Sequence, residues 1–155
     1  MAIKFSDSSR IPAPRSKVWK IIFDPAALSA CIPGCESLEQ VGENEFEATV
    51  VAKVGPIKAR FKGSVSIENS HQPFSCILHG QGSGGVAGQA SGHVNLRLDA
   101  ADENETDVAY EIDAQIGGKI AQLGNRIVVG TVKKIAAQFF ANMEEYVRRE
   151  TQTAS

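Results

Sequence analysis

The cysteines and histidines are the residues of this sequence that could bind a metal ion or carry out covalent chemistry. Cys31 and Cys35 lie four positions apart, and no histidine or further cysteine is near enough to complete a familiar zinc pattern. His79 and His93 fall on the outward side of predicted strands, and His71 falls in a turn. None has a serine, cysteine or carboxylate partner at a spacing that indicates a catalytic triad. The sequence therefore predicts surface histidines, reduced thiols, no metal site and no catalytic residue.

A glycine-rich segment at residues 80–88 superficially resembles a phosphate-binding loop. Such a loop needs a strand before it and a helix after it, because the helix N-terminus meets the anion. Here strands are predicted on both sides, and the Gly-Lys-Ser/Thr triplet does not occur. Two interpretations stay open for the segment: a hairpin turn with bends in the flanking strands, or the roomy end of a pocket.

Length and composition indicate one globular domain. The chain has 155 residues, 43% hydrophobic and 22% charged, with a net charge of −2 and a pI of about 5.9. This balance argues against nucleic acid as a partner. No run of about 18 apolar residues predicts a transmembrane helix, and the N-terminus lacks the apolar core of a signal peptide. We expect a domain over residues 1–150, a frayed tail over 151–155 and a cytoplasmic location.

Alternating apolar and polar residues predict strands with one buried and one exposed face. The buried phase of residues 46–67 is apolar throughout, and the residues between are mostly polar or charged. A later strand continues this phase with Gly88, Ala90 and Gly92, which have little or no side chain. A sheet that lacks side chains over one stretch leaves room for a ligand. Because this phase contains no Asp, Glu, His or Lys, we expect that ligand to be bound rather than transformed.

The order of the predicted elements is that of an α+β protein. A strand at residues 3–11 precedes two short helices within 12–30 and a six-stranded antiparallel meander within 37–116. One helix of about 30 residues is predicted from Lys119. Gly124 and Gly130 fall inside it, where close packing against the sheet or a kink would explain them. A curved sheet wrapped around this long C-terminal helix encloses a cavity unless bulky side chains fill it.

Four segments of the chain carry a resemblance to a known family. They are Ile-Pro-Ala-Pro at 11–14 with Val18 and Trp19, Asp24-Pro25 with Cys-Ile-Pro-Gly-Cys-Glu at 31–36, Lys-Val-Gly-Pro-Ile at 53–57, and the glycine-bearing helix start at 118–124. On these residues the chain resembles the helix-grip (START-like, SRPBCC) superfamily and, within it, the family of the carbon monoxide dehydrogenase G subunit. The similarity spans nearly the whole chain.

This resemblance implies an accessory protein of a CO-dehydrogenase-like molybdenum enzyme, a molybdenum hydroxylase-type dehydrogenase. Family members are linked to membrane recruitment of the enzyme and to carrying a lipophilic quinone in the cavity, without a covalently bound cofactor. Many members add a C-terminal membrane-binding segment, which this sequence does not contain. The expectation is therefore a hydrophobic small-molecule ligand and a peripheral contact with the inner face of the membrane.

The expected ligand site lies between the sheet and the long helix. Tyr110 is the inward sheet residue with a strong polar group, and its hydroxyl would meet either a protein partner or a ligand carbonyl. The predicted ligand-binding residues are Trp19, Phe23, Pro33, Gly34, Phe61, Gly88, Ala90, Gly92, Tyr110, Leu123, Ile127 and Thr131. The predicted site for docking a partner or anionic membrane is Lys53, Lys58, Arg60 and Lys62. A merely solvated face is the alternative for these cations.

Two other functions stay open beside the non-catalytic carrier. A cyclase or hydrolase of the helix-grip type would need titratable groups inside the cavity, whereas Glu36 and Arg126 would reach only its rim. A pure docking subunit would have a core that bulky side chains fill.

Overall fold

The computed structural model describes residues 1–153, which contain seven strands and four α-helices. The strands form one antiparallel sheet in the order β1-β7-β6-β5-β4-β3-β2. They are β1 (Ala2–Ile11), β2 (Cys35–Gly42), β3 (Glu45–Val54), β4 (Ile57–His71), β5 (Ser75–Ser83), β6 (Gln89–Asp102) and β7 (Glu105–Gly117). The helices are α1 (Arg15–Ile22), α2 (Pro25–Cys31), α3 (Lys119–Gln122) and α4 (Asn125–Thr153), with a 3-10 turn η1 at Gly85–Ala87.

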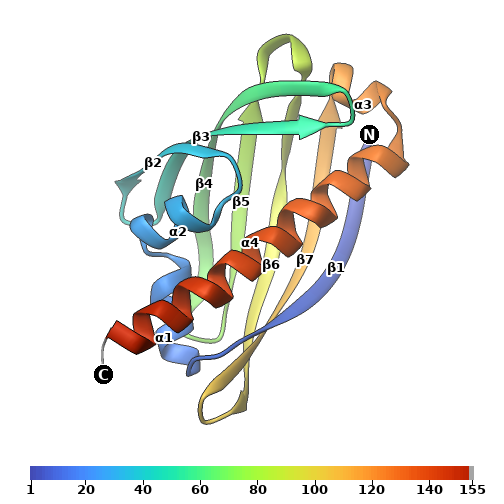
Figure 1. Ribbon diagram of the computed structural model, residues 1–155. Coiled ribbons are helices and arrows are strands. Elements are labelled where there is room, and N and C mark those ends of the chain that lie inside the picture. Colours follow the sequence, from blue (N-terminus) through green and yellow to red (C-terminus); the bar gives the residue numbers. More distant parts are fainter. Residues whose placement is uncertain (154–155) are drawn as a thin grey trace.

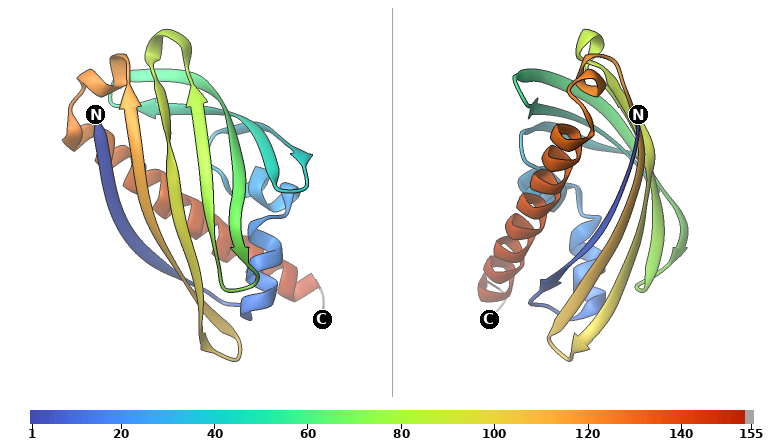
Figure 2. Two further views of the ribbon diagram at one scale, coloured as in Figure 1. Left: turned by 180° about the vertical axis from the view of Figure 1, so that it is seen from behind. Right: turned by 90° about the vertical axis from the view of Figure 1, so that its right-hand side faces the viewer.

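The sheet is curved, and α4 crosses its concave side (Figures 1 and 2). Strands β2 to β7 follow one another as a meander, and β1 pairs with β7 at the far edge. The short helices α1 and α2 lie toward the end of the sheet where α4 finishes (Figure 1). This architecture confirms the predicted α+β helix-grip fold. In the described part of the chain, no helix combines the length and apolar character that a membrane-spanning segment needs.

The region after β7 is two helices rather than the single helix that periodicity predicts. Helix α3 ends at Gln122, and Gly124 follows with a φ of +95°, a left-handed conformation that interrupts the helix. A Cβ at Gly124 or Gly130 would find no atom of a neighbouring element within 4 Å, so close packing explains neither glycine. Helix α4 then continues to Thr153. Residues 154–155 of the predicted tail lie outside the described residues.

Two hydrophobic clusters join the sheet to the helices. The α1 cluster includes Ile11, Val18, Trp19, Leu98, Val108, Met143 and Val147. The α3 cluster consists of Ile3, Val54, Ile116, Ile120 and Val128. Thr106 is buried beside the first cluster, and its hydroxyl donates to the Ala13 carbonyl at 2.8 Å. Because α1 and α3 lie toward opposite ends of the sheet, the clusters fix both ends of the fold (Figure 1).

Candidate functional site

An apolar cavity of about 490 Å³ lies between the sheet and α4. Inward residues of β3 to β7 form the sheet wall, as the alternation predicts, and α4 supplies the opposite wall. Ile22, Leu28 and Ile32 close the side formed by α1 and α2. The volume lies within the range of roughly 300–1,000 Å³ that is typical of small-molecule sites. The geometry therefore provides a container for an apolar ligand.

Aromatic rings make up much of the cavity wall. The Tyr110 ring stacks on Phe140 with centroids 4.9 Å apart and planes at 19°, and Phe140 stacks on Phe139 at 5.0 Å and 21°. Phe5 of β1 meets Tyr110 edge-on at 6.1 Å. Stacked rings of this kind offer flat faces to another ring. Of the chain's ten aromatic residues, six line the cavity within the described residues: Phe23, Phe46, Phe61, Tyr110, Phe139 and Phe140.

The Tyr110 hydroxyl is a polar group at this apolar site. The residue is only 6% exposed, and no residue among 1–153 forms a hydrogen bond with its hydroxyl. Every fully buried polar side-chain atom in the described residues has a partner, so the Tyr110 oxygen reaches open space. Burial, and then the negative charge of Asp7, raise the pKa of the Tyr110 phenol above its usual value. Tyr110 is therefore a neutral hydroxyl that can donate a hydrogen bond at physiological pH.

Four of the twelve predicted ligand-binding residues line the cavity, namely Phe23, Pro33, Phe61 and Tyr110. Trp19 is buried beside this wall, with its ring 5.0 Å from that of Phe23 in an edge contact. Gly34 lies in the turn after α2, and its carbonyl accepts a hydrogen bond from the Val51 N–H of β3 at 2.9 Å. Trp19 and Gly34 thus support the wall without forming it.

The predicted helical residues lie at the junction of α3 and α4. Leu123 and Ile127 approach the β3–β4 turn, because a Cβ at Gly55 would lie 3.4 Å and 3.3 Å from their side chains. The Thr131 hydroxyl donates to the Ile127 carbonyl at 3.0 Å within α4. The structure therefore places Leu123, Ile127 and Thr131 outside the cavity lining.

Gly88 and Gly92 are glycines because neighbouring backbone approaches them closely. Gly88 has a φ of +134°, and a Cβ there would lie 2.3 Å from the Gly117 carbonyl oxygen. A Cβ at Gly92 would lie 2.2 Å from the Asp113 carbonyl oxygen. Ala90 and Gly92 nevertheless border a second apolar hollow of about 260 Å³, next to the main cavity. The hairpin-turn interpretation thus describes Gly88, and open space lies further along β6.

Sequence reasoning missed the wall that α4 contributes. Val132, Ile135, Ala136, Phe139 and Phe140 line the cavity from this helix. Their spacing of three and four residues is the same apolar periodicity that predicts the helix. Projecting the sheet-facing side of the predicted helix would have identified them.

The predicted docking cations lie on the outer face of β3 and β4, away from the cavity. Lys53 and Lys58 stand directly opposite each other in the register. The Arg60 guanidinium donates two hydrogen bonds to the Glu36 carboxylate of β2, the second from Nη2 to Oε2 at 3.1 Å. This contact lowers the pKa of the Glu36 carboxyl. Arg60 therefore stitches β2 to β4, and Lys53, Lys58 and Lys62 carry the uncompensated positive charge of this group.

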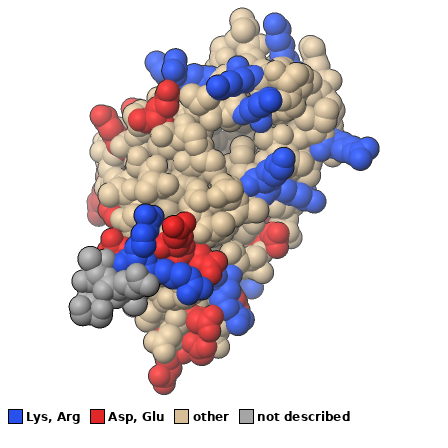
Figure 3. Space-filling model, in the orientation of Figure 1, with Lys and Arg blue, Asp and Glu red and all other residues tan. Residues whose placement is uncertain are grey.

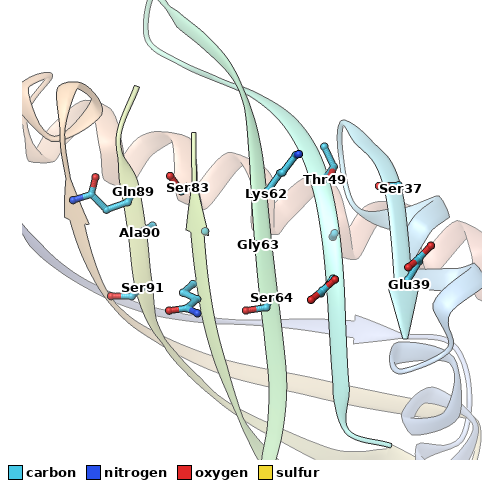
Figure 4. A pocket seen from close by; sticks show the side chains of 14 residues that line it. Ser37, Glu39, Thr49, Lys62, Gly63, Ser64, Ser83, Gln89, Ala90 and Ser91 are labelled. Carbon is cyan, nitrogen blue, oxygen red and sulfur yellow. The ribbon is translucent and has the colours of Figure 1, made fainter. Parts of the chain in front are cut away.

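The outer face of the sheet carries a polar groove in which Lys62 takes part. Figure 4 shows Lys62 beside Thr49 and Ser83, with Ser64 and Ser91 in the next row of side chains. On the face that carries α4, Lys and Arg side chains surround a hollowed area, and Asp and Glu gather toward the lower part (Figure 3). The charge of the molecule is therefore polarised although its net charge is small.

The cysteines and histidines lie apart from the cavity lining. No cluster of three or more His, Cys, Asp or Glu residues suited to a metal occurs within residues 1–153. Burial raises the pKa of the Cys31 thiol and raises that of Cys76 to about 11, which keeps both thiols protonated. His79 lies 3.1 Å from the Glu68 carboxylate on the outer face, with its ring centroid 5.8 Å from that of His93.

Comparison with known proteins adds one family and several solved structures. The sequence matches the family described as the G subunit of carbon monoxide dehydrogenase (CoxG) over residues 8–148. The fold is similar to the crystal structure of a conserved protein from Geobacillus kaustophilus, with a TM-score of 0.89, 26% identity, and 95% and 96% of the two chains covered. No curated protein matches the sequence.

Two enzymes are among the structural neighbours. The ZhuI aromatase/cyclase of a Streptomyces species has a TM-score of 0.74 and 11% identity, with 100% of this chain and 99% of that chain covered. Norcoclaurine synthase of Thalictrum flavum, solved with dopamine and hydroxybenzaldehyde, has a TM-score of 0.63 and 11% identity, with 96% and 88% covered. At this identity the likeness shows the shared fold alone.

Proposed function

Because the chain belongs to the CoxG family of carbon monoxide dehydrogenase, we propose that it is a non-catalytic accessory protein that holds a hydrophobic ligand for a CO-dehydrogenase-like molybdenum enzyme. The observation that carries this proposal is the apolar cavity of about 490 Å³ between the sheet and α4. Each ligand CH₂ group buried there would contribute about 0.8 kcal/mol to binding. Release to the partner requires that this gain stays moderate.

A lipophilic quinone is the ligand we propose, for three reasons of chemistry. Its flat ring matches the stacked faces of Tyr110 and Phe140. Its carbonyl oxygen can accept the hydrogen bond that the Tyr110 hydroxyl is free to donate. Its isoprenoid chain suits the aliphatic side chains of the sheet and α4 that complete the lining.

The composition of the cavity wall favours binding over catalysis. Among the described residues that line it, the polar side chains are those of Ser64, Gln81 and Tyr110, without a carboxylate, imidazole or amine. General acid–base catalysis needs a group poised to exchange a proton near the working pH. Glu36 is paired with Arg60 outside the cavity. We therefore prefer a carrier to a cyclase or hydrolase of this fold.

For the partner contact we propose the outer face of β3 and β4, where Lys53, Lys58 and Lys62 are exposed. Charges of this kind attract an acidic protein surface or anionic lipid headgroups, and each contributes about 1 kcal/mol near a charged membrane. A docking subunit with a filled core is the second candidate function. The open cavity weighs against it.

The test is native mass spectrometry with solvent extraction of the protein purified from its own host, followed by addition of quinones to ligand-free protein. We expect a co-purifying isoprenoid quinone, or binding of added quinone, in the native protein. Ala136→Leu should reduce this binding because Ala136 lines the cavity, whereas the neighbouring Ala137→Leu should not, because Ala137 is exposed. A ligand-free mass together with no binding of added quinone would favour the docking subunit.

A further inference from the structure

Part of the inner wall of the sheet carries almost no side chains. The residues concerned lie in two adjacent rows of the register across β4 to β7. We call them the bare wall: Gly63, Gly80, Gly82, Ala90, Gly92 and Ala114. The apolar hollow of about 260 Å³ lies over these rows. It shares Val65, Leu78, Gly82, Val94 and Ile112 with the main cavity, so the two spaces adjoin.

Close backbone packing does not explain all of the bare wall. A Cβ at Gly63 or Gly92 would lie 2.8 Å or 2.2 Å from a carbonyl oxygen of the adjacent strand. At Gly80 and Gly82, by contrast, the nearest atoms would be 3.6 Å and 3.5 Å away, which is ordinary van der Waals contact. Glycine weakens a strand, and the fold does not require it at these two positions. What the absent side chains of Gly80 and Gly82 provide is open space on the inner face.

The unpartnered Tyr110 hydroxyl lies beyond one end of this wall and is an independent sign of a ligand. Tyr110 and Ala114 are four residues apart on β7, about 13 Å at the rise of a strand. In the same register Leu96 stands opposite Tyr110, and Gly92 opposite Ala114. Bulky Val94 and Ile112 form the row between them. The polar group and the open wall therefore belong to one elongated space.

We propose that the ligand is an elongated amphiphile whose oxygen-bearing end accepts a hydrogen bond from Tyr110 and whose apolar chain extends along the bare wall. This inference rests on the proposed function and specifies its ligand class. A compact hydrophobe would occupy one end only and leave the other open. The bare wall thus sets the length of chain that the protein accepts, and Gly80 and Gly82 are its specificity-determining residues.

The experiment compares Gly80→Val and Gly82→Val with the native protein. The probes are quinones that carry from none to four isoprene units, and a parallel series of 2-alkanones of increasing length. Binding is followed by the fluorescence of Trp19, the single tryptophan, which contacts the cavity residue Phe23. Ser66→Val is the matched control, because Ser66 faces outward on β4, opposite His79. Urea unfolding establishes that each variant is folded.

We expect the native protein to bind longer chains more tightly up to a limit, and each glycine variant to lose about tenfold in affinity for long chains. Affinity for the tail-less head should stay within about twofold in every variant. Equal binding of long chains by native and variant proteins would overturn the inference, as would an equal loss for the tail-less head. If only the alkanones bind and follow the expected pattern, the wall assignment stands and the quinone proposal fails. If neither series binds, both fail.

Discussion

Replacing Tyr110 by phenylalanine isolates the role of its hydroxyl. In the ligand-free protein this hydroxyl has no hydrogen bond to any residue among 1–153, so its removal breaks no interaction of the fold. The stacked ring contact with Phe140 is retained, since phenylalanine keeps the ring. We therefore expect the free energy of unfolding to change by less than about 0.5 kcal/mol. A ligand that accepts the hydrogen bond would lose about 0.5–1.5 kcal/mol, which is roughly two- to tenfold in Kd.

The assay is a titration of native protein and Tyr110→Phe with two ligands of similar shape, a quinone and its analogue in which the carbonyl oxygens are absent. The quinone should bind more weakly to the variant, and the oxygen-free analogue should bind both proteins alike. Urea unfolding of both proteins measures stability in parallel. The reasoning is refuted if the variant is destabilised by about 1 kcal/mol or more, because the hydroxyl would then have an intramolecular partner. An equal loss of affinity for both ligands would refute the carbonyl contact.

Three other predictions follow from the described residues. Gly88→Ala should destabilise the protein by about 1–3 kcal/mol, because alanine is strained at a φ of +134°, and its melting temperature should fall by several degrees, whereas Gly80→Ala should change it little. A thiol reagent should modify Cys35 in the native protein and reach Cys31 and Cys76 only after unfolding, because burial raises the pKa of those two thiols; fast labelling of Cys76 in folded protein would contradict this. The pKa of Glu36 is lower in the folded than in the unfolded state, so its ion pair with Arg60 stabilises the fold at neutral pH and is lost as pH falls through the folded pKa. Chemical unfolding should therefore show a difference between native protein and Glu36→Gln at neutral pH that disappears in acid, and a difference independent of pH would exclude the ion pair as its cause.

The sequence predicts the strands well because a single signal decides each of them. Strand β3 spans Glu45–Val54, the predicted range, and its apolar phase faces the cavity. The alternation of apolar and polar residues depends only on which face is buried, and turn residues mark the ends. The same signal is weaker where both faces are polar. Strand β4 therefore continues to His71, three residues beyond its predicted end at 68, through a polar stretch that alternation does not mark.

The break before α4 could not be predicted from periodicity, because the apolar pattern continues across it. Leu123 and Ile127 keep helical spacing on either side of Gly124. A glycine in a helical pattern is compatible with a continuous helix at a cost of about 1 kcal/mol, so the residue type does not decide the matter. The positive φ of Gly124 is set by how α3 and α4 each pack on the sheet, which is a tertiary effect.

Glycines also limit what the sequence reveals about the site. A glycine in a strand leaves open space in one place and permits close approach of a neighbouring backbone in another, and its residue type is the same in both. Gly88 and Gly92 belong to the second kind, with a carbonyl oxygen 2.3 Å and 2.2 Å from a hypothetical Cβ. Gly80 and Gly82 belong to the first, and only the structure distinguishes them. The position of the α4 wall, by contrast, was available from helical spacing.

Stability and ligand binding reside in different residues of this fold. The members of the α3 cluster do not line the cavity, and neither do Leu98, Val108, Met143 and Val147, which are among the most deeply buried side chains of the α1 cluster. Many wall residues, such as Val50, Phe61 and Ile112, are only half-buried, so a change there costs less folding energy. Effects of substitutions at separate, non-contacting sites are nearly additive. Variants of the wall should therefore change affinity in a protein that stays folded, which is the condition under which binding data can discriminate a carrier from a docking subunit.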